Sequence, residues 1–236
     1  MKDLPISQVS TFTLFRFRGR HAFWIFGQMQ KAKKKFDRVP GLLFYKLMGS
    51  GGKNGFSKML NVNTYALHCV WRSESDAEKF FTESALFSEF ETRATERYTI
   101  FMKTVKAHGL WDKRNPYSPQ DVSSSGPIAV ITRARIRLRY VPKFWRHVPS
   151  LGTRATQAKG SIFSIGIGEY PWFMQATFSI WESREAMQAF AYGSALHTDV
   201  IRKTRELGWY SEELFANFVP YKTLGSWKDL RLELDR

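Results

Sequence analysis

The chain has 236 residues, which is enough for one large domain or two small ones, each with a buried core. Its 43% hydrophobic and 24% charged residues exclude a disordered chain, and the single cysteine, Cys69, excludes a disulfide framework and fits a reducing cytoplasm. The net charge of +15 favours an anionic partner, but no RNP1-type strand or helix-turn-helix pattern supports nucleic-acid binding.

The first part of the chain is predicted to alternate strands with helices. An aromatic face predicts a helix over 21–38, and Ser73 is a good N-cap for a second helix. Patterns typical of strands occur at 9–17, 42–52, 63–71 and 98–105.

A stretch rich in Pro, Ser and Gly, 115–127, is predicted to link two halves. Beyond it the same series returns, with a helix over 142–151 and Ser183 as the N-cap of another. The expected strands are 128–137, 161–169, 172–181 and 214–219.

The two series match residue by residue at an offset of 110. Residues 71–87 and 181–197 align without a gap, with coincidences at Trp71/Trp181, Ser73/Ser183, Phe80/Phe190, Ser84/Ser194, Ala85/Ala195 and Leu86/Leu196. With small gaps, Phe23-Trp24 matches Phe144-Trp145, Gly49 and Gly51 match Gly166 and Gly168, and Gly109 and Trp111 match Gly225 and Trp227.

This order predicts an α+β fold, a tandem duplication of ferredoxin-like βαββαβ units. Residues 1–114 form the first half, 115–127 the linker and 128–236 the second half. Packed sheet to sheet, the halves form a fused dimeric α+β barrel, a pseudo-dimer. The 16% aromatic share indicates a large core or a cavity for a flat or elongated apolar ligand, which we expect inside the barrel.

No phosphate-binding loop, zinc motif or nucleophile elbow occurs, so the histidines are the main candidates for chemistry. His21 and His108 are expected at the surface, His147 at the surface or as a helix cap, and His68 as a hydrogen-bonded core histidine.

His197 differs from these. The pattern predicts a helix over 195–207 in which His197 shares an apolar face with Val200, Ile201, Thr204 and Leu207, while its counterpart in the first half is Phe87. A buried, hydrogen-bonded imidazole is one interpretation, and a single neutral imidazole on a haem iron is the other.

The strand before it carries a polar strip. Gln175, Thr177 and Ser179 correspond to Tyr65, Leu67 and Cys69 of the first half. The strip would supply donors near a bound O₂ or an oxidised substrate, or it faces solvent.

Five segments resemble the spheroidene monooxygenase family, the acyclic carotenoid ketolases of photosynthetic bacteria. The segments are FRFRGRHAFWIFGQM (15–29), PGLLFYKLMGSG (40–51), FWRHVP (144–149), GIGEYPWFMQATFSIW (166–181) and HTDVIRKTRELGWYSEELFANF (197–218). The resemblance extends from about residue 11 to about residue 219. It implies a haem b cofactor, insertion of oxygen from O₂ into a carotenoid, and a reduced ferredoxin or similar electron donor.

The leading hypothesis is a haem-dependent monooxygenase that acts on a carotenoid or other long apolar substrate. His197, which coincides with a histidine of the family pattern, is the proposed iron ligand, and Gln175 and Arg146 are the catalytic candidates. The other proposed cofactor-binding residues are Trp145, Trp172, Phe178, Ile201 and Trp209, and Arg146 is expected to neutralise a haem propionate.

No apolar run could span a membrane and no signal segment opens the chain, so we expect a cytoplasmic protein, peripheral on the inner, anionic face of a membrane. Two alternatives stay open. One is a haem protein of the same fold with peroxidase, dismutase or dehydratase chemistry, and the other is a cofactor-free carrier of an apolar ligand. Nucleic-acid binding would rest on charge alone.

Overall fold

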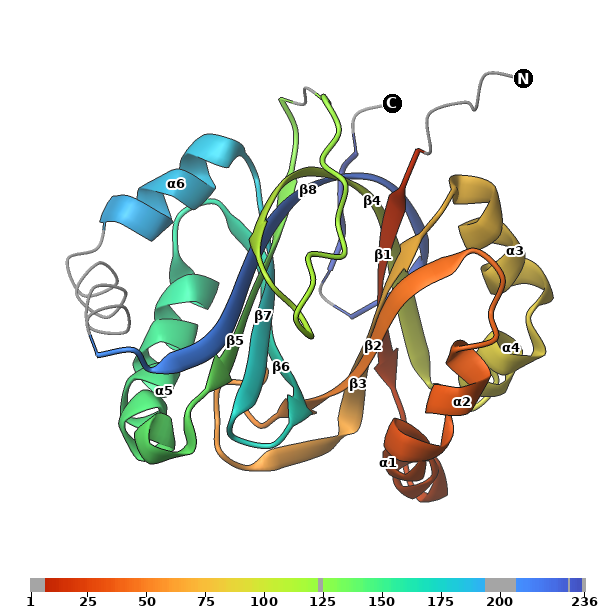
Figure 1. Cartoon of the computed structure of the whole chain (residues 1–236), viewed down its shortest axis with the longest axis horizontal. Helices are drawn as coiled ribbons and strands as arrows, with labels where there is room; N and C mark the ends of the chain where they lie inside the picture. Colours follow the sequence, from red (N-terminus) through yellow and green to blue (C-terminus); the bar gives the residue numbers. More distant parts are fainter. Residues whose placement is uncertain (1–6, 123–124, 194–206, 229, 235–236) are drawn as a thin grey trace.

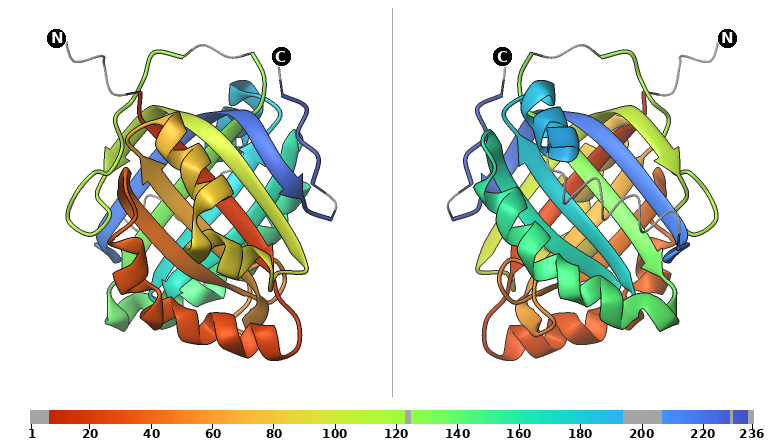
Figure 2. Two further views of the ribbon diagram at one scale, coloured as in Figure 1. Left: turned by 90° about the vertical axis from the view of Figure 1, so that its right-hand side faces the viewer. Right: turned by 90° about the vertical axis from the view of Figure 1, so that its left-hand side faces the viewer.

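A closed eight-stranded antiparallel barrel forms the centre of the molecule, with helices on its outside (Figures 1 and 2). The computed structural model describes residues 7–122, 125–193, 207–228 and 230–234. The strands are β1 (Val9–Arg16), β2 (Leu42–Gly51), β3 (Leu60–Trp71), β4 (Glu96–Gly109), β5 (Ile128–Ile136), β6 (Ser161–Tyr170), β7 (Met174–Trp181) and β8 (Tyr210–Ser226). They close in the order β1-β3-β2-β6-β7-β5-β8-β4.

Both halves of the barrel have the same strand order and register. The first half runs β4-β1-β3-β2 and the second runs β8-β5-β7-β6, with seams at β2–β6 and β4–β8. Val9 pairs with Trp71 in the first half, and Ile128 pairs with Trp181 in the second. The two Trp residues that set the sequence offset therefore occupy the same place in each sheet.

Serine side chains cap the start of one helix in each half. Ser73 Oγ accepts from the Asp76 N–H at 3.2 Å, and Ser183 Oγ accepts from the Ala186 N–H at the same distance, which confirms both predicted N-caps. The helices are α1 (Arg20–Lys31), α2 (Lys33–Phe36), α3 (Glu74–Glu83), α4 (Ala85–Glu91), α5 (Val141–Gln157) and α6 (Arg184–Gly193), with a 3₁₀ turn η1 (Leu138–Tyr140) before α5. Among the described helices, none is long and apolar enough to cross a bilayer.

The single helix predicted over 21–38 is wrong, because the chain breaks it at Ala32 into α1 and α2. The break turns Phe36 inward, where its ring stacks on Tyr45 with centroids 4.8 Å apart. Burial of Phe36 therefore favours the break.

The middle of the barrel interior is a packed core, which is one of the two outcomes that the aromatic content predicts. Phe12 and Phe178 stack across it at 3.8 Å, and further large rings from Trp111 and Phe218 fill the same cluster. The chain segment after β4 closes one mouth of the barrel, which Figure 1 shows as the yellow-green trace across the ring of strands. Trp111 and Tyr117 of that segment are buried, so this connection is part of the core.

Charged side chains fix that segment in the mouth. Arg133 is buried and pairs with Glu212 and Glu169, and Glu169 also accepts from Trp111 Nε1 at 2.8 Å. Lys46 Nζ lies 2.5 Å from the second oxygen of Glu169. The buried Arg133 guanidinium is therefore compensated by two carboxylates, as burial of a charge requires.

Candidate functional site

The two halves differ most on the outer face of each sheet, which the helices flank. In the first half this face is bulky: the middle strands β2 and β3 present Tyr45, Leu47, Tyr65, Leu67 and Cys69 outward, packed against the helices. At the same register positions β6 and β7 present Ser164, Gly166, Gln175, Thr177 and Ser179. Gly168 occupies the place of Gly49, so the predicted match of Gly49 with Gly166 is wrong by two residues, and Gly166 stands where the first half has Leu47. The second half therefore offers a flatter and more polar surface to its helices.

Exposure of the next strand shows the same difference. Thr13 of β1 is buried under the helices of the first half, whereas Thr132, which occupies the equivalent place on β5, is exposed. Thr132 pairs with Thr177 on one side and with Phe215 on the other. An exposed residue in the middle of a central strand marks a part of the sheet that the described helices leave uncovered.

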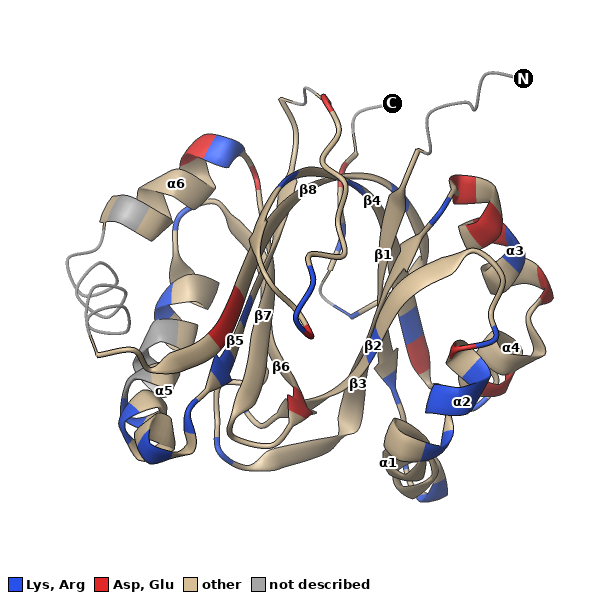
Figure 3. Cartoon of the chain, in the orientation of Figure 1, with Lys and Arg blue, Asp and Glu red and all other residues tan. Residues whose placement is uncertain are grey.

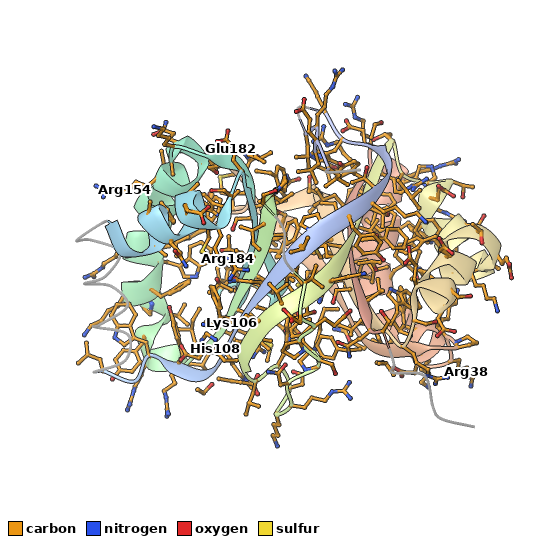
Figure 4. All side chains as sticks on the ribbon, turned by 90° about the horizontal axis from the view of Figure 1, so that it is seen from above. Arg38, Lys106, His108, Arg154, Glu182 and Arg184 are labelled. Carbon is orange, nitrogen blue, oxygen red and sulfur yellow. The ribbon has the colours of Figure 1, made fainter. Side chains whose placement is uncertain are left out.

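The end of β4 adds two basic side chains to this face. β4 runs on to Gly109 beside β8, so that Lys106 pairs with Asn217 and His108 pairs with Phe215 (Figure 4). The His108 ring lies 5.2 Å from the Phe215 ring, and both His108 and Lys106 are exposed. His108 is solvent-facing as predicted, but the strand expected to end at residue 105 continues through it to Gly109.

Two buried polar atoms on or beside the same face have no hydrogen-bond partner within the described residues. They are Ser164 Oγ on β6 and Asn217 Oδ1 on β8. Buried polar atoms are ordinarily satisfied, so each of the two is a candidate contact for a group beyond the described residues. The exposed part of this face lies around Thr132, beside Lys106 and His108.

The structure brings together only some of the predicted site residues. Trp145 on α5 is buried and donates through Nε1 to the Trp172 carbonyl at 2.9 Å, which joins the helix to the β6–β7 hairpin. Trp172 has a positive φ of 70° and is half exposed. Arg146, the next residue on α5, is exposed.

Gln175 and Phe178 lie on opposite faces of β7. Gln175 is on the outer face, where its Nε2 donates to the Tyr170 carbonyl at 3.2 Å. Phe178 points into the packed interior against Phe12, so it does not line the same surface as Gln175. The alternation of a strand requires this separation, since Gln175 and Phe178 are an odd number of residues apart.

Trp209 is buried just before β8, with its ring stacked on Tyr140 at 6.1 Å. His197 and Ile201 lie outside the described residues. In the part of the chain that is described, no three His, Cys, Asp or Glu side chains gather as a metal cluster.

His68 is the core histidine that the sequence predicted. Its Nδ1 lies 3.0 Å from the Thr11 carbonyl and its Nε2 lies 2.9 Å from the Tyr117 hydroxyl. Burial lowers the pKa of His68 to about 4, although the bond to Thr11 opposes the shift. Both ring nitrogens are engaged, so His68 is a structural residue.

The solved structures most useful for comparison are two aldoxime dehydratases. One, in complex with butyraldoxime, has a TM-score of 0.59 at 12% identity and covers 92% of this chain and 80% of that one. The other has a TM-score of 0.55 at 12% identity and covers 93% of this chain and 83% of that one. At this identity the likeness shows the fold alone. No family model matches the chain.

Curated relatives are much closer in sequence. The spheroidene monooxygenase of Rhodobacter capsulatus is 35% identical over 223 residues, which cover 93% of this chain and 92% of the relative. That of Cereibacter sphaeroides is 33% identical over 224 residues, which cover 94% of this chain and 69% of the relative. That of Rubrivivax gelatinosus is 30% identical over 208 residues, which cover 88% of this chain and 80% of the relative. The chain therefore belongs to the spheroidene monooxygenase family of oxidoreductase enzymes.

Proposed function

We propose that the chain is a monooxygenase that inserts oxygen from O₂ into an acyclic carotenoid, with haem b held on the outer face of the second-half sheet. Family membership supports the reaction and the substrate class, because relatives that match nearly the whole chain are named for the oxidation of spheroidene. The observation that carries the cofactor's position is the replacement of large apolar residues on this face by Gly, Ser and Thr.

The residues of this face fit a haem. A porphyrin is flat and apolar with two carboxylates, and it needs a surface without protruding side chains and cations near its edge. Thr177 and Thr132 share one register row of this face and carry short side chains, and Lys106 at its margin is a cation for a propionate. The middle of the barrel interior offers no comparable space, since Phe12 and Phe178 fill it.

His197 is the residue that would hold the haem iron. It follows α6 in the chain, and α6 contacts β7 of the same sheet. A neutral imidazole is the ordinary protein ligand of haem b iron. A haem held by these residues would supply the iron chemistry that uses O₂, with electrons from a reduced ferredoxin or similar donor.

The other side chains act on binding and orientation. The Trp145–Trp172 hydrogen bond holds α5 against the β6–β7 hairpin and so fixes one edge of the surface. Gln175 uses one N–H on the Tyr170 carbonyl, which leaves its second N–H as a donor toward an oxygen atom above the sheet. Arg146 is exposed on α5 and is the second candidate for a propionate.

We also propose that the barrel is a fused pair of ferredoxin-like units, as the sequence offset predicts. The identical strand orders of the two halves and the shared register of Trp71 and Trp181 support this. Only the second unit then keeps a surface for a cofactor, because the first fills the equivalent surface with Tyr65, Leu67 and Cys69.

The visible spectrum of the purified protein tests the cofactor. A Soret band is expected after reconstitution with haemin, and a protein that stays colourless contradicts the proposal. His197→Ala is expected to remove or shift the band, with His108→Ala as the matched control because His108 lies on the same face. Loss of the band in the control alone would assign the iron to His108 instead.

Co-expression with a carotenoid-producing pathway tests the reaction. A keto-carotenoid is expected with the parent protein and not with His197→Ala. A haem protein that forms no oxidised carotenoid but turns over peroxide or an aldoxime would favour the alternative chemistry of this fold. A colourless protein that retains carotenoid would instead be a carrier.

A further inference from the structure

One edge of the molecule gathers exposed apolar side chains from segments far apart in the sequence. We call it the hairpin edge and define it as residues 18–31, 53–63, 137–146 and 170–173. It contains α1, the loop of the β2–β3 hairpin, η1 with the start of α5, and the turn of the β6–β7 hairpin. Figures 1 and 2 show these elements along the lower side of the molecule in all three views.

Hydrogen bonds join the four segments into one continuous surface. The Phe17 N–H, just before the first segment, donates to the Asn63 carbonyl at 2.8 Å. Trp172 Nε1 donates to the Lys58 carbonyl at 3.4 Å and thereby links the two hairpins, and Trp145 links α5 to Trp172. The edge is therefore a fixed arrangement of the barrel and its helices.

The apolar side chains of this edge protrude. Phe23 is 79% exposed, Phe26 61%, Met59 76%, Leu138 73% and Trp172 49%. Phe23 and Phe26 are three residues apart on α1 and so share its outer face. Scattered exposed apolar residues are ordinary, but five large ones from four segments on one edge mark a contact surface.

The positive charge of the hairpin edge indicates an anionic partner. Its four segments hold nine Lys or Arg and no Asp or Glu, against a net charge of +15 for the whole chain. The nine are Arg18, Arg20, Lys31, Lys53, Lys58, Arg137, Arg139, Lys143 and Arg146. Within the described part of the chain none of them forms an ion pair, and Figure 3 shows the basic residues along this side. Glu169, one residue before the β6–β7 segment, is turned inward to Lys46 and Arg133.

From this juxtaposition we propose that the hairpin edge docks on the surface of an anionic lipid bilayer. Protruding Phe, Trp, Leu and Met side chains enter the headgroup region, and the unpaired cations around them meet lipid phosphates. An acidic protein would match the charge, but side chains that protrude from separate elements, such as the flexible Met59 before β3 and Leu138 on η1, suit a fluid surface better than a shaped one.

The same edge connects the membrane to the proposed site. Trp172 and Trp145 belong both to the edge and to the boundary of the second-half surface. On the proposed function, an apolar carotenoid would reach that surface from the bilayer without crossing water. This last step rests on the proposed function, whereas the docking surface itself does not.

Sedimentation with vesicles tests the docking. The purified protein is expected to bind vesicles of phosphatidylcholine with phosphatidylglycerol at low ionic strength, to bind phosphatidylcholine alone weakly, and to lose most binding in high salt. Phe23→Ser/Phe26→Ser and Lys58→Glu are each expected to weaken binding, the charge reversal by about 25-fold at about fivefold per unit charge. Lys79→Glu on α3 is the matched control, since Lys79 is exposed but outside the edge.

The depth of Trp172 gives a second measurement. Vesicles with brominated acyl chains are expected to quench part of the tryptophan fluorescence, and Trp172→Phe is expected to remove that part. Failure to bind anionic vesicles, or equal binding by Lys58→Glu and Lys79→Glu, overturns the proposal. If Lys58→Glu instead weakens only the binding of an acidic ferredoxin, the edge is a protein-docking surface and the membrane proposal fails. The vesicle assay needs neither haem nor turnover, so its outcome is independent of the proposed reaction.

Discussion

The Nε2 atom of His68 accepts a hydrogen bond from the Tyr117 hydroxyl across 2.9 Å, which ties the middle of β3 to the segment that closes the barrel mouth. The Thr11 carbonyl can only accept, so Nδ1 carries the ring proton and Nε2 is left as an acceptor. Burial lowers the pKa of His68 to about 4 and raises the pKa of Tyr117. Both groups are therefore neutral at physiological pH.

The lowered pKa of His68 predicts acid destabilisation. An unfolded histidine titrates near 6.5, so as pH falls from about 6.5 to about 4 the unfolded chain binds a proton that the folded chain refuses. The free energy of unfolding is expected to drop by about 3 kcal/mol across this window and to be unaffected by His68 above it. Urea unfolding at a series of pH values measures the drop. His68→Gln is expected to flatten the curve, and an unchanged curve would mean that other groups cause it.

The buried Arg133 predicts a strong dependence on its partners. Burial alone would raise the pKa of Glu212, but the Lys113 N–H and Arg133 together hold it below its usual value. Arg133→Met leaves Glu212 without its cation in the barrel mouth and is expected to lower the free energy of unfolding by about 3–5 kcal/mol. Adding Glu212→Gln is expected to recover part of the loss. If the double variant is no more stable than Arg133→Met, the pair is not the cause.

The outer faces of the two sheets predict opposite responses to the same substitution. Thr13→Phe places a ring in a packed layer and is expected to destabilise the fold by about 1–3 kcal/mol. Thr132→Phe places it on an exposed surface and is expected to leave the melting temperature nearly unchanged while it reduces haem uptake. Thermal melting and haemin titration of both variants check this. A strongly destabilised Thr132→Phe would show that this face is as closely packed as that of the first half.

The contact between the β2–β3 loop and β6 predicts sensitivity at Gly55. Its φ is +89°, and a Cβ at this position would meet the Gly166 carbonyl oxygen at 1.8 Å. Gly55→Ala is therefore expected to lower the melting temperature, whereas Gly27→Ala on α1, where a Cβ meets nothing within 4 Å, is expected to raise it slightly. Equal melting temperatures for the two variants would contradict the contact.

The sequence predicts the strands and the matched halves well, because both depend on local alternation and on the offset between Trp71 and Trp181. It does not predict the extent of β4, since residues 106–109 become a strand only through pairing with β8 more than 100 residues away. The predicted strand accordingly ends at residue 105, before His108. The continued alternation of Lys106 and His108 around Ala107 was the one signal that could have extended the strand.

The sequence also does not predict on which face of the second-half sheet the proposed site lies. The polar strip of Gln175, Thr177 and Ser179 was found, but periodicity cannot say which face of a strand points into a barrel. The stacking of Phe12 on Phe178 shows that the apolar face of β7 points into the barrel, so the polar strip points outward. The family resemblance, in contrast, is confirmed over nearly the whole chain.

The two seams of the barrel are unequal: β4 and β8 pair over twelve residues each, whereas β2 and β6 pair only through Gly49–Gly168 and Ser50–Ile167. Breathing motions of the closed sheet must therefore begin at the short seam. Of the two seams, amide hydrogen exchange is expected to be faster between β2 and β6 and slower between β4 and β8. The hairpins of the hairpin edge lie at the short seam. A bilayer that holds them together would therefore slow amide exchange at this seam and stabilise the closed barrel.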